Sequence, residues 1–240
     1  MKKRTKLIII ALISIIFIGI LGWNNIHYQA TDKALSATEY SISRSNTLYF
    51  EGDKDKPLVI FYPGALVDAE SYSVWAKELS DKGYSLAIVK MPFNMAFLGA
   101  NRAEEIIDDL NPNGYVIGGH SLGGVMASRF ASNRLSENDD KLKGVFFFAS
   151  YPDEKGNLAN SKLPILSIDG SEDQIVNQIN KKEALRYLPE NTTIKEIEGG
   201  NHAGFGTYGQ QKGELPGTLS NQEQQTILVE IMEEWLINIK

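Results

Sequence analysis

The sequence predicts an α/β fold in which a mainly parallel sheet carries helices on both faces, with one transmembrane helix before the domain. Two observations predict the domain. Short apolar runs alternate with helical patterns after residue 46, and these runs are continuous, which is typical of strands buried on both faces. A third observation, a long uncharged run behind a basic tip, predicts the membrane helix.

The composition excludes several classes of function. The chain has 240 residues, 42% hydrophobic and 22% charged, which is ordinary for a globular domain whose hydrophobic core is stable without disulfide bonds or structural metal ions. It contains no cysteine, so disulfides, thiolate metal sites and a cysteine nucleophile are excluded. With three histidines and a net charge of −6, we expect no metal, no cofactor and no nucleic-acid partner.

Residues 1–28 combine a basic tip with an apolar run and predict a membrane anchor. The positive charges come first, on Lys2, Lys3, Arg4 and Lys6. Residues 7–26 are uncharged, and a helix of about 20 such residues crosses a bilayer. The positive-inside rule then keeps the basic tip in the cytoplasm and places the domain on the extracytoplasmic side of a single-pass cell-membrane protein.

A cleaved signal peptide, which would release a secreted domain, is the alternative interpretation. Signal cleavage needs small residues one and three positions before the cut. Ala30 and Ala37 are preceded at that spacing by Tyr28 and Leu35, which are large side chains. The uncleaved anchor is therefore favoured.

Residues 29–44 are polar and mixed, which predicts a linker, and the domain occupies residues 45–240. Its first two strands are predicted at the apolar residues 47–50 and 58–62. A helix follows at 70–82, because apolar side chains recur there at the three-to-four spacing of one helix face, on Tyr72, Trp75, Ala76 and Leu79. The next elements are an apolar strand and a short helix with acidic residues on its outer face, at 84–89 and 101–110.

The second half of the domain continues the alternation and ends on a helix. A strand at 115–118 runs through a glycine-rich turn into a helix at 122–135. The remaining runs predict strands at 145–149, 165–168 and 193–197, and helices at 174–188 and 222–239. Sites in parallel sheets form at the carboxyl ends of strands, so we expect the chemistry in the loops after these strands.

The turn after residues 115–118 predicts a nucleophile. It reads Gly119-His120-Ser121-Leu122-Gly123, a G-x-S-x-G pattern between a strand and a helix, which is the sequence signature of a nucleophile elbow. Glycines on either side remove side chains that would clash beside a strained residue. Ser121 would also lie at a helix amino terminus, which favours a developing anion. A glycine-rich turn with an incidental serine is the alternative.

With this motif the chain resembles the α/β-hydrolase fold family over about residues 47–240. It is most similar to a small, lidless bacterial branch whose members often carry an amino-terminal anchor. The resemblance is carried by Phe-Tyr-Pro-Gly-Ala at 61–65, Met-Pro-Phe-Asn at 91–94 and Gly-Asn-His at 200–202. It implies that a nucleophile, an acid and a histidine follow one another in that order.

The general base is found by elimination among the three histidines. His27 lies beside the predicted membrane segment, and His120 adjoins the nucleophile, so its side chain should point away from the Ser121 hydroxyl. His202 remains, on a glycine-rich loop after the strand 193–197. Its imidazole can take the serine proton and return it to a leaving group. A surface loop histidine without a catalytic role is the alternative.

The family pattern G-x-x-D after the strand 165–168 points to Asp173 as the acid that orients His202. Asp169 and Glu172 in the same loop are rivals, and Asp169 could instead stabilise the turn. Asp153 and Glu154, after the preceding strand, are less favoured.

Two backbone N–H groups are expected to form the oxyanion hole. One belongs to Leu122, directly after the nucleophile. The other belongs to Ala65, with Leu66 as the second choice, in a loop where many family members have His-Gly and this chain has Pro-Gly. Asp68 in the same loop is predicted to cap the following helix.

These residues predict a membrane-anchored serine hydrolase of the carboxylesterase type, which cleaves small or exposed carboxylic esters through a Ser-His-Asp acyl-enzyme mechanism. About 15 residues separate the strands at 145–149 and 165–168, too few for a helical lid domain. The partner expected is a small-molecule or lipid-like ester. The alternatives are an acyltransferase that uses the same triad on a lipid or wall component, and a non-catalytic binding module on a hydrolase scaffold.

Overall fold

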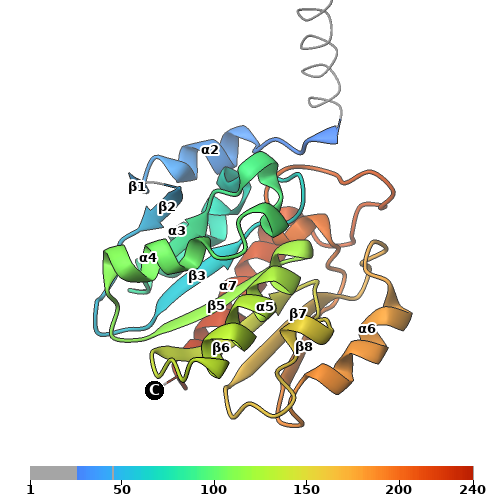
Figure 1. The fold of residues 1–240 in the computed structure, drawn as a ribbon. Helices are drawn as coiled ribbons and strands as arrows, with labels where there is room; N and C mark the ends of the chain where they lie inside the picture. The colour runs from blue at the N-terminus through green and yellow to red at the C-terminus, as the bar shows by residue number, and fades with distance from the viewer. Residues whose placement is uncertain (1–25, 45, 240) are drawn as a thin grey trace, which may run out of the picture.

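The computed structural model describes residues 26–44 and 46–239, which fold around one eight-stranded sheet of order β1-β2-β4-β3-β5-β6-β7-β8 (Figure 1). Strands β3 to β8 pair in parallel, and β2 pairs antiparallel with both β1 and β4 at one edge. The predicted, mainly parallel sheet is therefore confirmed. The strands are β1 Ile42–Arg44, β2 Thr47–Phe50, β3 Leu58–Tyr62, β4 Leu86–Val89, β5 Tyr115–His120, β6 Leu142–Phe148, β7 Ile165–Gly170 and β8 Thr193–Ile197.

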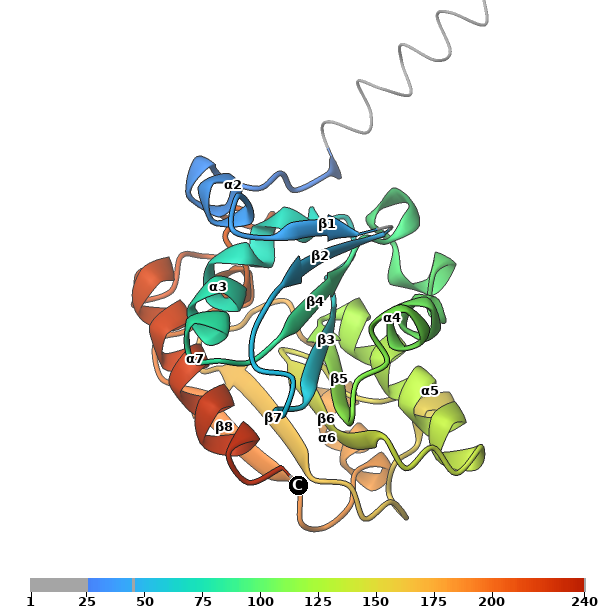
Figure 2. The same cartoon turned by 90° about the vertical axis from the view of Figure 1, so that its left-hand side faces the viewer.

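Helices cover both faces of this sheet (Figure 2). Helices α3 and α7 lie on one face, and α4 and α5 lie on the other. The inner strands β3, β4, β5 and β7 are buried along their whole length, because each of their faces packs against a helical layer. The helices are α2 Asp32–Thr38, α3 Ser73–Asp81, α4 Arg102–Leu110, α5 Leu122–Ser136, α6 Gln178–Ala184 and α7 Asn221–Leu236.

The stretch 29–44 differs from the expected linker, because it contains α2 and β1 and packs on the domain. Ala34 is buried, and the hydroxyls of Thr38 and Ser73 share a hydrogen bond of 2.7 Å that joins α2 to α3. Strand β1 pairs with β2, yet its three residues are exposed. An edge strand exposed on both faces has no hydrophobic alternation, so its sequence looks like a linker.

The predicted helix at 174–188 is shorter in the structure, where α6 begins at Gln178. The Asp173 carboxylate accepts the N–H groups of Ile175 and Val176, and this local turn competes with helix formation. The chain after β7 is therefore kept as a loop at the carboxyl edge of the sheet.

The predicted basic tip and nearly all of the predicted membrane segment fall in residues 1–25, which lie outside the described part of the chain. Among residues 26–44 and 46–239, none of the helices combines the length and the apolar character needed to span a bilayer.

Candidate active site

Ser121 has a strained backbone between β5 and α5, with φ 52° and ψ −124°. The residues two positions before and after Ser121 must be glycine, because a Cβ on Gly119 would lie 2.5 Å from the carbonyl oxygen of Tyr62, and a Cβ on Gly123 only 2.1 Å from the same atom. The Ser121 N–H donates to the Phe148 carbonyl at 3.0 Å, which fixes the turn against β6. The strand, turn and helix of a nucleophile elbow are thus present.

Among the described residues, the backbone N–H groups of Ala65 and Leu122 near this turn have no hydrogen-bond acceptor, and neither has that of Gly123. Leu122 is the first residue of α5, so its N–H has no intrahelical partner. Ala65 lies between two held residues: the Gly64 N–H donates to the Tyr72 hydroxyl at 2.9 Å, and the Leu66 N–H donates to the Asn94 carbonyl at 2.8 Å. Leu66 has a left-handed φ of 61°, which turns the loop at this point.

His202 and Asp173 form a buried pair, with side chains 1% and 2% exposed. The His202 Nδ1 and the Asp173 Oδ2 are 2.8 Å apart. The other carboxylate oxygen accepts the N–H groups of Ile175 and Val176 at 2.8 and 2.9 Å. Burial alone would raise the pKa of Asp173, but the hydrogen bonds from His202 and from the two backbone groups lower it below its usual value. An ionised Asp173 fits a hydrogen bond donated by Nδ1 of His202.

His202 lies beside the elbow, because its ring packs against that of His120 with centroids 4.4 Å apart. Within the described residues, no hydrogen bond joins His202 to the Ser121 hydroxyl. Catalytic hydrogen bonds are often long in the free enzyme and shorten when substrate binds. The structure therefore brings the predicted base next to the residue that precedes the predicted nucleophile.

The other two histidines have different partners. The Tyr72 hydroxyl accepts the Gly64 N–H and shares a hydrogen bond of 2.9 Å with Nδ1 of His120. Burial lowers the pKa of His120 well below its usual value, so this imidazole is neutral. Nε2 of His27 contacts the Asp68 carboxylate at 2.5 Å.

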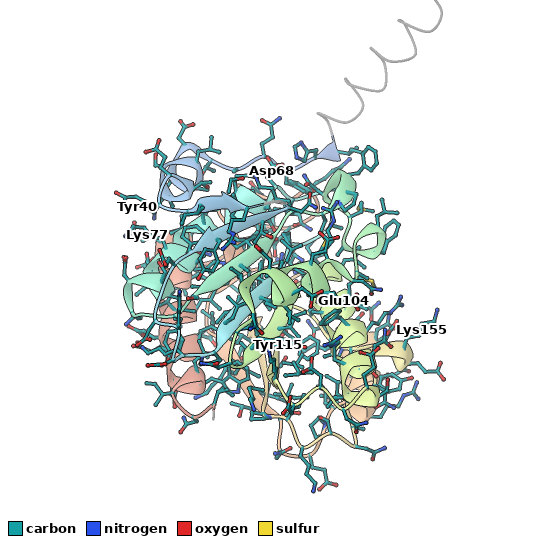
Figure 3. The ribbon with its side chains drawn as sticks, turned by 60° about the vertical axis from the view of Figure 1, so that its left-hand side comes forward. Tyr40, Asp68, Lys77, Glu104, Tyr115 and Lys155 are labelled. Atoms are coloured by element: carbon teal, nitrogen blue, oxygen red, sulfur yellow. The ribbon has the colours of Figure 1, made fainter. Side chains whose placement is uncertain are left out.

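Asp68 does not cap the following helix, because its side chain makes no capping hydrogen bond. Its carboxylate instead accepts from the side chain of Asn94 at 3.0 Å and from the N–H of Ala30 at 3.3 Å. Figure 3 shows Asp68 next to the segment that leads from residue 26 to α2. The prediction that Asp68 caps the following helix is therefore wrong. Its actual partners lie on segments that are distant in the sequence, so the sequence around Asp68 did not indicate them.

The rival acids are bound elsewhere. Asp169 pairs with Nζ of Lys181 at 2.5 Å, and burial raises the pKa of Asp169 despite this partner. Glu172 accepts the N–H of Thr218 at 2.8 Å and also contacts its hydroxyl. Asp173 is the carboxylate of this loop that contacts His202.

Asp153 and Glu154 lie on a separate turn after β6. The Asp153 carboxylate accepts from Nε of Arg129 at 3.0 Å and from the N–H of Gly156 at 3.0 Å. Glu154 is exposed. Neither carboxylate contacts a residue of the His202 loop.

Glu214 is a buried carboxylate that the sequence analysis missed. It is 4% exposed, and its two oxygens accept the N–H groups of His202 and Ala203 at 2.5 and 3.0 Å. Burial raises the pKa of Glu214, while these two hydrogen bonds oppose the shift. Glu214 belongs to the loop before α7, where a single sequence gives no sign of which carboxylate is buried. It holds the backbone that carries the His202 imidazole.

Gln224 holds the same loop from the first turns of α7. Its Oε1 accepts the N–H of Asn201 at 3.0 Å, and its Nε2 donates to the Asn201 carbonyl at 2.8 Å. A Cβ on Gly204 would lie 1.8 Å from Oε1 of Gln224, so a side chain at this position would displace the Gln224 amide from the loop. A capping box of Ser220 and Glu223 fixes the start of α7, so the helical turn that carries Gln224 is rigid.

We find no cluster of three or more histidine, aspartate or glutamate side chains arranged to hold a metal ion in residues 26–44 and 46–239. The chemistry that the described side chains can support is nucleophilic: a strained serine, a buried imidazole with its carboxylate, and two unoccupied N–H donors.

Comparison with known proteins gives one family match. A model described as the Alpha/beta hydrolase family matches residues 58–226, which include the elbow, the Asp173 loop and His202. A search of the curated proteins found no match for the chain.

Three solved structures illustrate the similarity of fold. A putative hydrolase from Agrobacterium vitis S4 has a TM-score of 0.59 at 12% identity, covering 82% of this chain and 97% of that one. An esterase domain of a Rhodothermus marinus protein has a TM-score of 0.58 at 14% identity, covering 80% and 92%. A monoacylglycerol lipase from Paleococcus ferrophilus has a TM-score of 0.58 at 14% identity, covering 80% and 100%. At such identities the likeness shows a common fold.

Proposed function

Because this chain belongs to the alpha/beta hydrolase family, we propose that it is a serine hydrolase that cleaves carboxylic esters through a covalent acyl-enzyme. The observation that carries the proposal is the buried His202–Asp173 pair, 2.8 Å apart, packed beside the strained Ser121. A structural histidine has no need of a buried, ionised partner next to a strained serine, whereas a general base does.

The proposed reaction proceeds in two halves. His202 takes the proton of the Ser121 hydroxyl as its oxygen attacks the ester carbonyl, and the N–H groups of Ala65 and Leu122 bind the resulting oxyanion. His202 then gives the proton to the leaving alcohol, which departs and leaves the acyl group on Ser121. Water repeats the sequence, so the acid is released and the serine regains its proton.

The substrate is expected to be small or exposed. The connection from β6 to β7 contains one short helical turn, Glu154–Gly156, and no lid domain. An open site accepts short esters from solution as well as ester groups presented on a larger surface.

We propose in addition that residues 1–26 anchor the enzyme in the cell membrane, with the hydrolase domain on the extracytoplasmic side; His27 and Tyr28, at the end of the predicted anchor, instead pack on the domain. The sequence supports this through its basic tip and uncharged run. Protease treatment of intact cells should release an acidic domain of roughly 200 residues. A domain that is protected from the protease would reverse the proposed orientation.

A fluorophosphonate probe tests the chemistry. It should label the wild-type protein, Ser121→Ala should abolish labelling, and Ser136→Ala, which replaces an exposed serine at the far end of α5, should not. Release of free acid from a short ester identifies hydrolysis, whereas appearance of the acyl group on an added alcohol identifies acyl transfer. A folded wild-type protein that takes no label would refute the proposal and favour a binding module.

A further inference from the structure

The amino-terminal segment, residues 26–31, is built into the loop that carries Ala65. The Tyr28 N–H donates to the Leu66 carbonyl at 2.8 Å, and the Asp68 N–H donates to the Tyr28 carbonyl at 3.0 Å. Tyr28 thus pairs in parallel with Val67, as a short strand would. The chain is therefore fixed at the proposed oxyanion hole before α2 begins.

The same segment also contacts the loop that carries His202. The Thr31 N–H donates to the Thr207 carbonyl at 3.0 Å, and the ring of Tyr28 lies 5.5 Å from that of Tyr208. The Tyr28 hydroxyl accepts the N–H of Lys212 at 3.2 Å. Tyr28 therefore joins the loop that carries Ala65 to the loop that carries His202. We call Tyr28 and these two loops the rim of the site.

This position limits how far the site can lie from the proposed membrane anchor. The apolar run of the sequence ends at Trp23, five residues before Tyr28. A fully extended chain covers at most about 3.6 Å per residue, so Tyr28 lies within about 18 Å of the end of that run.

Exposed apolar side chains occur on the segments around this rim. Ile26 is 54% exposed, Phe97 52%, Leu98 51% and Leu215 64%. Phe97 and Leu98 follow Asn94, whose carbonyl holds Leu66, and Leu215 follows Glu214. Figure 1 shows the amino-terminal segment, the turn near residue 97 and the loop before α7 at one end of the molecule. Apolar side chains of this kind gain free energy by entering the interface of a bilayer.

We propose that this end of the molecule lies against the bilayer and that the enzyme cleaves esters carried at the bilayer surface. The inference rests on the proposed hydrolase activity and on the proposed anchor. It adds that the anchor orients the site: Tyr28 fixes the rim of the site to the point where the chain leaves the membrane.

The test compares two esters with the full chain in phosphatidylcholine vesicles. One ester is soluble and short, and the other is a long-chain fluorescent ester embedded in the vesicle. A rigid helical spacer of about 25 residues, inserted between Asn25 and Ile26, would lift the site by about 37 Å. A flexible glycine-serine spacer of the same length, which still allows the site to reach the lipid, is the matched control.

We expect the rigid spacer to lower cleavage of the embedded ester at least tenfold and to leave cleavage of the soluble ester unchanged, with a smaller loss for the flexible spacer. The double substitution Phe97→Ser, Leu98→Ser should lower cleavage of the embedded ester severalfold. Equal cleavage of the embedded ester by the wild type and the rigid-spacer variant would overturn the inference.

The outcomes also separate this inference from its premises. If the wild type cleaves neither ester, the proposed hydrolase activity fails and the inference fails with it. If the wild type cleaves the soluble ester but does not float with vesicles, the anchor fails. If it floats and cleaves the soluble ester alone, the proposed orientation is wrong.

Discussion

Replacing Glu214 with glutamine should disturb the His202 loop without changing the volume of the side chain. The carboxylate accepts one N–H on each oxygen, at 2.5 and 3.0 Å, whereas the amide presents one oxygen and one NH₂ group. A hydrogen bond to a charged acceptor contributes about 1.5–3 kcal/mol. Burial raises the pKa of Glu214, so ionising it in the folded state has a cost, and this cost disappears in the variant. We therefore expect a loss of about 1.5 kcal/mol in the free energy of unfolding, at the lower end of that range.

The effect on activity should exceed the effect on stability. A domain of ordinary stability, about 5–15 kcal/mol, stays almost fully folded after such a loss. A shift of about 1 Å in a catalytic group lowers the rate by about 100-fold, so we expect kcat/KM for a soluble ester to fall by about 10- to 100-fold. Fluorophosphonate labelling of Ser121 should slow in parallel. Urea denaturation gives the stability of the same samples.

Glu172→Gln is the matched control for Glu214→Gln. Glu172 also binds a neighbouring loop through its carboxylate, by the N–H of Thr218 at 2.8 Å, but has no contact with His202. This variant should keep its labelling rate. The reasoning would be refuted if Glu214→Gln were as active as the wild type, or if both variants lost the same activity.

Three further predictions concern stability. The pKa of Asp173 is lower in the folded state than in the unfolded chain, so the wild type should be more stable than Asp173→Asn at neutral pH. In urea titrations this difference in stability should shrink as the pH falls from about 3.9, the pKa of the unfolded chain, through the lower pKa of the folded state. The pKa of His120 is lowered in the folded state, so the stability of the wild type should decline below about pH 6.5, by up to about 1.4 kcal/mol per pH unit. His120→Gln should show a shallower decline. If the stability of both proteins fell with pH at the same rate, this would count against a neutral buried imidazole. Gly123→Ala should lower the free energy of unfolding by more than about 3 kcal/mol, because its Cβ would lie 2.1 Å from the Tyr62 carbonyl oxygen. In Gly114→Ala, the control, the new Cβ meets only the flexible Lys143 side chain, so thermal melts should show a far smaller loss of stability.

The parts of the fold that follow from the sequence are the strands that carry a recognisable run of apolar or β-branched residues, whether buried like β3 or largely exposed like β8. Strands β2, β3 and β8 have the predicted bounds, because a run of apolar or β-branched residues between turns specifies a strand locally. Strand β1 was missed because all three of its residues are exposed, so its pairing with β2 depends on the tertiary structure. The start of α6 was misplaced because the Asp173 side chain competes for the backbone donors that follow it.

The candidate site divides in the same way. Ser121 follows from a local pattern, and His202 from the small number of histidines. The structure brings Asp173 to His202, in agreement with the order that the family resemblance implies, although the catalytic roles stay predictions. Glu214 could not be predicted, because its burial depends on how a loop without secondary structure closes over residues 202–203.

The burial of the His202–Asp173 pair has a consequence for the range of substrates. Many enzymes must close a flap over their substrate to shield the proton-transferring groups from bulk water, which limits the bulk they accept. Here those two side chains are 1% and 2% exposed with no closure at all. The desolvated surroundings of the proposed base are part of the resting fold, so the proposed acylation of Ser121 does not require the enzyme to surround the molecule that carries the ester. A substrate as extended as a sheet of lipid or a polymer strand is then compatible with efficient proton transfer.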